Sequence, residues 1–347
     1  MLKKEIRKLS CLLILLILLI LQSGCSLAGR LKQPIEDFRN ATSVVVASAR
    51  VGYSLVNDIA LDDELRKAQC AQKRPAKECR PTDIDVAKLV SSRTISNDGM
   101  KARLDALESL DKYVTLLAEL VNSDKPERIT AAADDLQKSI DSLAVQITKL
   151  EQPDTAGAAD AHDSAVHAAN QKRFIASVGI FSNAIGIILS ALGNRKRDKA
   201  LKKAVLDGDK AVKEIIAGLK SDFSIFWSQK KQDANNDIHD SFSALNTEIE
   251  ASGGVTATRP DSGTLARLRS NVIQAVKNRD IIVSTDPDES LTAMATAHDE
   301  LVKLANEPTE NNFIASAAAI QAYLGAATRL GGAIIKLHQI KIEEEAK

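Results

Sequence analysis

The fold class is decided by the stretch Ile129–Leu150, which reads ITAAADDLQKSIDSLAVQITKL. Its apolar residues recur in alternating steps of four and three, at Ile129, Ala133, Leu136, Ile140, Leu143, Ile147 and Leu150. A repeat that averages 3.5 residues is typical of helices that bury one face against nearly parallel neighbours, as in coiled coils and antiparallel bundles. The stretch therefore predicts an amphipathic helix inside a helical bundle.

The same spacing recurs over 107–121, 201–219 and 238–249, and no segment alternates apolar and polar residues for long enough to predict a strand. We expect helices near 35–66, 83–122, 127–150, 163–250, 261–282, 287–305 and 311–345. The breaks between them, near 67–82, 151–162, 251–260, 283–287 and 305–311, contain most of the prolines. The helix over 163–250 would be about 130 Å long, with a kink at Gly193-Asn194. The chain is thus predicted to be all-α, an elongated antiparallel helical bundle with coiled-coil-like packing over 35–347.

The composition of the 347 residues agrees with this class. Hydrophobic residues make up 44% but aromatic residues only 3%, and 8 Pro and 16 Gly are too few for collagen, a disordered chain or a turn-rich β-sandwich. Lys plus Arg equals Asp plus Glu at 46 each. Because nucleic-acid-binding proteins rely on basic surfaces and aromatic stacking, no nucleic-acid partner is expected for this neutral chain.

The N-terminus has the features of an export signal. Residues 1–10 hold four basic side chains, and Leu12–Leu21 is an unbroken run of Leu and Ile. As a helix the run is about 15 Å long, half of a bilayer core, which fits the apolar region of a signal peptide rather than a stable span. We therefore expect residues 1–24 to be cleaved.

The next residues, Gln22-Ser23-Gly24-Cys25, resemble the lipobox of bacterial lipoproteins, in which a cysteine follows two small residues and an aliphatic one. Gln22 stands where Leu is usual. The resemblance implies that the Cys25 thiol receives a diacylglyceryl group and that its new amino group is acylated, which anchors the chain to a membrane. Ser26, in place of the Asp that retains lipoproteins in the inner membrane, implies the outer membrane and its periplasmic face, with 25–34 as a tether. The alternative is an ordinary cleaved signal peptide with a chance cysteine.

Two further cysteines, Cys70 and Cys79, flank a polar turn that contains Pro75. In an exported protein this spacing predicts a local disulfide. Free thiols are one alternative and a metal site is another, although the sequence lacks the CxxC spacing and the nearby histidine that zinc sites use. No metal or other cofactor is expected.

The stretch 174–192 carries no charged residue and has basic residues on both flanks. Gly179, Gly186 and Gly193 are seven residues apart, which predicts a seam where another helix approaches closely. The expected neighbour is 313–335, which begins with the same Phe-Ile-Ala-Ser tetrapeptide. We interpret 174–192 as a buried helix of the bundle, although its length of about 29 Å would also suit a membrane span.

Catalytic motifs such as GxSxG and HExxH are missing, and the five histidines show no ligand spacing. Phe223, Phe226 and Trp227 are expected to form a core cluster where helices cross. The six bases of Arg195–Lys203 are either a solvated helix end or a contact with anionic lipid or peptidoglycan.

These features predict a non-enzymatic, lipid-anchored periplasmic scaffold or adaptor of the bacterial envelope, with a protein partner and no small-molecule substrate. The alternative is a membrane-active protein that resembles the α-helical pore-forming toxins in organisation, with 174–192 as its inserting segment.

Overall fold

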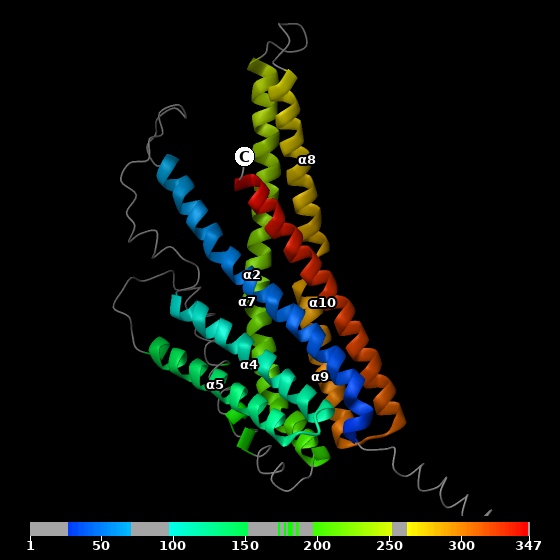
Figure 1. The fold of residues 1–347 in the computed structure, drawn as a ribbon. Coiled ribbons are helices and arrows are strands. Elements are labelled where there is room, and N and C mark those ends of the chain that lie inside the picture. The colour runs from blue at the N-terminus through cyan, green and yellow to red at the C-terminus, as the bar shows by residue number, and fades with distance from the viewer. Residues whose placement is uncertain are drawn as a thin grey trace, which may run out of the picture.

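The computed structural model describes residues 27–70, 97–151, 197–251 and 262–345, together with 173, 177, 180–182 and 185–186. Within these ranges every regular element is an α-helix and no strand occurs, so the all-α prediction is confirmed (Figure 1). The helices are α2 (Leu27–Cys70), α4 (Asn97–Asn122), α5 (Pro126–Glu151), α7 (Arg197–Ala251), α8 (Ser262–Ser284), α9 (Pro287–Asn306) and α10 (Glu310–Glu345).

The helices pack side by side as a bundle (Figure 1). Helix α2 lies between α4 and α10, α4 also packs against α5, and α9 packs against both α10 and α7. Helix α7 also contacts α4 and pairs with α8 along its C-terminal half. No described helix combines the length and the hydropathy that crossing a bilayer requires.

The predicted seams form the core. The members of the 129–150 repeat from Ile129 to Ile147 are at most 6% exposed, and the repeat over 107–121 is at most 2% exposed. Phe223, Phe226 and Trp227 form the expected buried cluster, with adjoining ring centroids 6.4 and 5.7 Å apart. The Trp227 indole N–H donates to the carbonyls of Ile282 and Thr285 at 3.0 and 2.7 Å, which fixes the junction of α7 with the end of α8.

One predicted boundary near the N-terminal side is wrong. The tether over 25–34 is helical from Leu27 onward, with Ala28 and Leu31 at 2% and 0% exposure. Pro34 lies inside this first helix. Of the predicted 83–122 helix, the structure describes Asn97–Asn122 as helix α4, and residues 83–96 lie outside the described ranges.

The described part of the 174–192 stretch runs antiparallel to α7. Arg173 Nη1 donates to the Ala217 carbonyl at 3.1 Å. Further along, the Phe181 ring packs against Tyr113 with centroids 5.2 Å apart, and the Tyr113 hydroxyl donates to the Ala204 carbonyl at 3.3 Å. The neighbouring residue of α7 therefore moves from 217 back toward 204 as the chain advances from 173 to 181.

A continuous helix over 163–250 is therefore wrong. In such a helix residues 173 and 217 would lie about 65 Å apart, not in hydrogen-bond contact. The predicted kink at Gly193-Asn194 lies outside the described residues. The antiparallel arrangement is favourable because it buries Ser177, Phe181 and Ile185, which are at most 3% exposed, against the bundle.

Beyond Trp227, α7 and α8 continue together as a two-helix projection whose far end extends past the other described helices (Figure 1), while α8 also contacts α10. We call this projection, residues 228–251 of α7 with α8, the arm. The apolar repeat at Ile238, Phe242, Leu245 and Ile249 lies in the arm, where Phe242 and Ile249 are 53% and 37% exposed. This segment of the predicted seam is therefore only partly covered.

Candidate functional site

The predicted glycine seam is not present where the structure can be described. A Cβ atom built on Gly186 would meet nothing within 4 Å, and the residue is exposed, so Gly186 admits no close neighbour. Gly179 and Gly193 lie outside the described residues. The expected partner segment, 313–335, belongs to α10, whose main neighbours are α2 and α9. In the 174–192 stretch, Ser177, Phe181 and Ile185 are buried whereas Gly186 is exposed. The described part of this stretch therefore packs against the bundle with one face.

Close backbone approach occurs instead at Gly208 in α7 and Gly331 in α10. A Cβ on Gly208 would lie 2.7 Å from a ring carbon of Tyr113, and a Cβ on Gly331 would lie 2.8 Å from Val44 Cγ1. Gly208 occupies an apolar position of the 201–219 repeat, a signal that was available in the sequence. Both contacts tie distant parts of the chain together.

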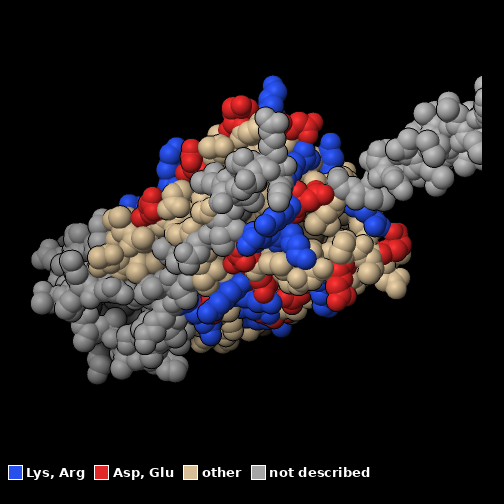
Figure 2. All heavy atoms as spheres, turned by 90° about the horizontal axis from the view of Figure 1, so that it is seen from below, with Lys and Arg blue, Asp and Glu red and all other residues tan. Residues whose placement is uncertain are grey.

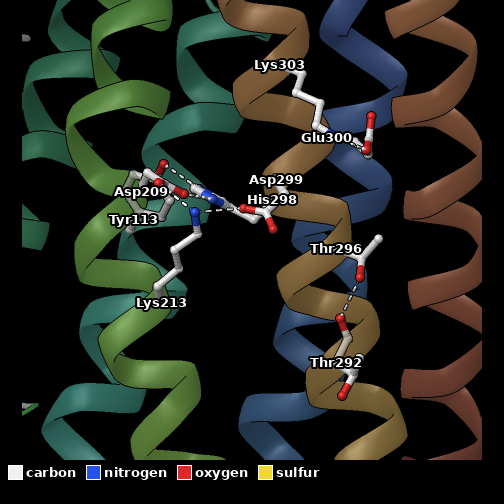
Figure 3. A network of polar contacts seen from close by, with 9 residues as sticks. All are labelled: Tyr113, Asp209, Lys213, Thr292, Thr296, His298, Asp299, Glu300 and Lys303. Carbon is white, nitrogen blue, oxygen red and sulfur yellow. Dashed lines mark hydrogen bonds and ion pairs between the residues drawn. The ribbon is translucent and has the colours of Figure 1, made fainter.

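Tyr113 belongs to a chain of polar contacts that joins α4, α7 and α9, which we call the His298 cluster (Figure 3). His298 is 1% exposed, and its Nδ1 and Nε2 atoms lie 3.2 Å from Asp209 Oδ1 and 3.2 Å from the Tyr113 hydroxyl. Because a carboxylate only accepts hydrogen bonds, the Nδ1 atom carries the proton in this contact.

The outer end of the cluster is an ion-pair chain. Lys213 Nζ lies 2.9 Å from Asp209 Oδ2 and 2.8 Å from Asp299 Oδ1, so it bridges α7 and α9 (Figure 3). Burial alone would raise the pKa of the Asp209 carboxyl, but hydrogen bonds from His298 and Lys213 outweigh it and lower the pKa. Those contacts with the carboxylates in turn raise the pKa of Lys213.

Asp209, His298 and Tyr113 contact one another in the order carboxylate, base and hydroxyl. Enzymes that use a nucleophilic hydroxyl have the same order of groups. Burial, with smaller contributions from the charges of Asp209 and Asp207, raises the pKa of the Tyr113 hydroxyl far above its ordinary value. Tyr113 is 1% exposed, and its hydroxyl already contacts His298 and a backbone carbonyl. This geometry supports a structural junction of three helices.

A second buried cluster, centred on Arg103, joins α2, α4 and α7. The Nε and Nη2 atoms of Arg103 donate hydrogen bonds to the Asp222 carboxylate at 2.7 and 3.0 Å. The Tyr53 hydroxyl donates to the same carboxylate at 2.8 Å. Burial would lower the pKa of the guanidinium, but Asp222 outweighs it and raises the pKa. Sequence reasoning missed this Arg103 cluster, since an isolated Arg and an isolated Asp on amphipathic helices look like solvated charges.

The basic run Arg195–Lys203 is partly used inside the molecule. Arg197 donates to the carbonyls of Leu120 and Val121 at the end of α4, at 2.6 and 2.5 Å, and pairs with Asp124. Lys202 donates to the carbonyl of Asn306 at 3.4 Å, the last residue of α9. Cations at these positions satisfy carbonyls left free at helix C-termini. Seen along this end, Lys and Arg lie among Asp and Glu, without a patch of one sign dominating the visible face (Figure 2).

The arm carries the most accessible apolar surface. A hollow of about 560 Å³ runs beside α7 there, and its described lining residues are Asn235, Ile238, His239, Phe242, Ser243, Asn246, Thr247 and Glu250. These residues follow one another in alternating steps of three and one, which places them along a single helix face. The hollow is therefore a shallow, open strip along a helix, which suits a protein surface better than an enclosed small molecule.

Two of the predicted site cysteines lie outside the described residues: Cys25, the lipidation residue, and Cys79, one member of the disulfide. The lipidation and the disulfide therefore remain predictions. Across the described ranges no group of His, Cys, Asp and Glu could hold a metal ion. Comparisons with protein-family models, with curated proteins and with solved structures find no match to this chain.

Proposed function

We propose that this protein is a lipid-anchored scaffold or adaptor of the bacterial envelope, which holds a protein-docking arm at a distance from the membrane. In this proposal Cys25 is the anchor, the outer membrane is the site, and the bundle is a rigid spacer without enzymatic activity. The docking element is the arm, because exposed apolar side chains gather there.

One observation carries the proposal: the first turn of α2, which follows Cys25 closely in the sequence, and the arm lie at opposite ends of α7, the longest described helix. The Ala28 amide donates to Asp198 Oδ1 at 3.1 Å, so the first turn of α2 lies beside the first turn of α7. Cys25 precedes Ala28 by three residues, a reach of about 10 Å at most. Helix α7 has 55 residues and is therefore about 80 Å long. A lipid on Cys25 would thus leave the tip of the arm tens of ångströms from the membrane.

The ends of several other helices support the same arrangement. Arg30 pairs with Glu310, which brings the start of α10 to the start of α2. Arg197 binds the end of α4, and Lys202 binds the end of α9. The anchored end is thus the part of the bundle where helix ends are tied together, as a stable base requires.

The membrane-active alternative requires 174–192 to leave the bundle. Ser177, Phe181 and Ile185 would have to give up their burial, and Phe181 its contact with Tyr113. No described contact favours such a release, so we place this function second.

The anchor is tested by growing cells with an alkyne-bearing fatty acid and measuring label on the full-length chain. The wild-type chain and the Cys70→Ala control should take up label, and Cys25→Ala should not, because its thiol would be the acceptor. Replacing residues 1–25 by a cleaved, non-lipidated export signal should move the protein from the membrane to the soluble periplasmic fraction. Equal labelling of Cys25→Ala and wild type would refute the proposed anchor.

A further inference from the structure

The ends of six helices meet in one surface, which we call the base and which comprises residues 27–33, 122–128, 197–203 and 306–312. Four contacts hold it together: the Ala28 amide with Asp198, Arg30 with Glu310, Arg197 with Asp124, and Lys202 with the Asn306 carbonyl. They bring the first turns of α2, α7 and α10 beside the turn from α4 to α5 and the last residue of α9. The base is therefore one continuous surface at the end of the bundle that lies opposite the arm.

The proposed anchor position brings the base to the membrane. Cys25 precedes Ala28 by three residues, a reach of about 10 Å at most. The headgroup layer on each side of a bilayer is itself about 5–8 Å thick. Helix α2 is already folded at Leu27, and Ala28 is 2% exposed, so the chain adds no flexible spacer from Leu27 onward. A lipid on Cys25 would therefore hold the base at the level of the headgroups.

The arginines of the base are used within the fold. Each of them pairs with a carboxylate: Arg30 with Glu310, Arg128 with Glu119 and Arg197 with Asp124. Charges of both signs are accordingly visible on the molecule when it is seen from this side (Figure 2). The arginines therefore contribute little free positive charge to the base.

The lysines of the base differ from its arginines. In the part of the chain that the structure describes, none of them pairs with a carboxylate: Lys32, Lys125, Lys199, Lys202 and Lys203. In total the base contains eight basic residues and five acidic ones. The excess positive charge is thus carried by ammonium groups that surround the start of α7.

We propose that the base docks on the headgroups of the anchoring membrane, with its lysines bound to the phosphates of acidic phospholipids. An ammonium group is a compact charge with three donors, so it binds a phosphate without demanding one fixed geometry. The lysines belong to α2, α7 and the turn from α4 to α5, so they surround the point at which the chain leaves toward Cys25. The lipid and the lysines then act on the same patch of membrane.

This inference rests on the proposed function and deepens it, because the lipid on Cys25 is what brings the base to the membrane. A lipid alone would leave the body free to swing about Cys25. A docked base removes that freedom, and because α7 begins in the base and ends in the arm, it also fixes the direction in which the arm points. Two weak contacts in one molecule reinforce each other without any further interaction.

The test uses the chain 26–347, which keeps every residue that the structure describes and lacks the proposed lipid site. Its binding is measured by co-sedimentation with vesicles of phosphatidylcholine alone and with vesicles of equal parts phosphatidylcholine and phosphatidylglycerol. We expect binding to the acidic vesicles and none to the neutral ones. Added salt should weaken the binding, because it screens exposed charges.

The contact is assigned to the base by a set of four substitutions, Lys32→Gln, Lys125→Gln, Lys199→Gln and Lys203→Gln. A single lysine beside an acidic membrane strengthens binding about fivefold, so the base variant should bind about a hundred times more weakly. None of the four side chains makes an ion pair with a described residue, so the fold should tolerate the changes, and urea titration checks this.

The matched control removes the same charge from exposed lysines elsewhere, with Lys101→Gln, Lys231→Gln, Lys277→Gln and Lys336→Gln. These positions lie about 30 Å or more from the base along their helices, beyond the screening length of about 10 Å. The control variant should therefore bind like the wild-type chain.

Two results would overturn the proposal: a wild-type chain that does not prefer the acidic vesicles, or a base variant that binds them as well as the control variant. Because the chain 26–347 lacks Cys25, neither result depends on lipidation. Fatty-acid labelling of the full-length chain reports the anchor separately, so a failure of the base is distinguishable from a failure of the proposed anchoring.

Discussion

Replacing Gly208 by Ala tests whether the contact of α7 with Tyr113 is as close as the structure shows. The new methyl group would lie 2.7, 2.8 and 2.9 Å from Cε2, Oη and Cζ of Tyr113, each inside van der Waals contact. In a helix interior, Gly to Ala normally stabilises by about 1 kcal/mol. Overpacking a rigid site costs about 1–3 kcal/mol.

The cost should lie at the upper end because the Tyr113 ring cannot move freely. It packs against Phe181, and its hydroxyl contacts His298 and the Ala204 carbonyl, so a shift would weaken contacts worth about 1 kcal/mol each. We therefore expect Gly208→Ala to lower the free energy of unfolding by about 2 kcal/mol. Urea titration followed by far-UV circular dichroism measures this change.

Two adjacent glycines of α10 provide matched controls. A Cβ on Gly332 would meet nothing within 4 Å, so Gly332→Ala should stabilise the protein by about 1 kcal/mol. A Cβ on Gly331 would lie 2.8 Å from Cγ1 of Val44, a β-branched side chain with little rotamer freedom, so Gly331→Ala should be destabilising. If Gly208→Ala were as stable as Gly332→Ala, the close approach of α7 to Tyr113 would be refuted.

Three further results are expected. Arg103→Met should lower the free energy of unfolding by about 3–5 kcal/mol in urea titration, because the buried Asp222 carboxylate loses the Arg103 guanidinium; Arg103→Met with Asp222→Leu should cost less than the single change. The pKa of Asp209 is lowered in the folded state, so ionised Asp209 contributes its full stabilisation at pH values above the ordinary carboxyl range. This contribution is lost as the pH falls through the lowered pKa. Asp209→Asn should therefore reduce the dependence of the free energy of unfolding on pH below about 4. Mass measurement after thiol alkylation without reductant should find Cys70 and Cys79 unmodified, and two added groups would exclude the disulfide.

The core of the bundle could be predicted from the sequence because burial follows the apolar repeat directly. The repeat from Ile129 to Ile147 is buried at every position, and so are Trp227 and its two phenylalanine neighbours. A helix that buries a stripe of aliphatic side chains shows that stripe as an apolar repeat in its own sequence. Which residues face inward was therefore predictable without knowledge of the neighbours.

The neighbour of each stripe could not be predicted in the same way. The stretch around Phe181 has the same repeat whether it continues into α7 or folds back against it, and the contacts of Arg173 with Ala217 and of Phe181 with Tyr113 distinguish the two. Gly186 has the heptad spacing of a close contact, yet it faces solvent, whereas Gly331 has no such pattern and packs against Val44. Small residues permit close approach on any face, so spacing alone does not identify the face that uses it.

The two buried polar clusters specify the register in which the helices pack, which the apolar seams alone do not. Seams of Ala, Leu, Val and Ile with a 3.5-residue repeat present a similar surface after a shift of one heptad, so apolar burial discriminates weakly between registers. The Arg103 cluster and the His298 cluster each lie where three helices meet. A shift of about 10 Å, one heptad, would leave buried charges without partners, at a cost of several kcal/mol.

The same reasoning separates the body of the bundle from its arm. In the body the apolar seam is covered, and the polar clusters hold three helices in one register. In the arm, Phe242 and Ile249 keep the heptad spacing of a core seam but remain 53% and 37% exposed. A two-helix element cannot cover both sides of such a seam, whereas four helices can. The arm therefore keeps the apolar repeat of a helical core without the further helices that would cover it.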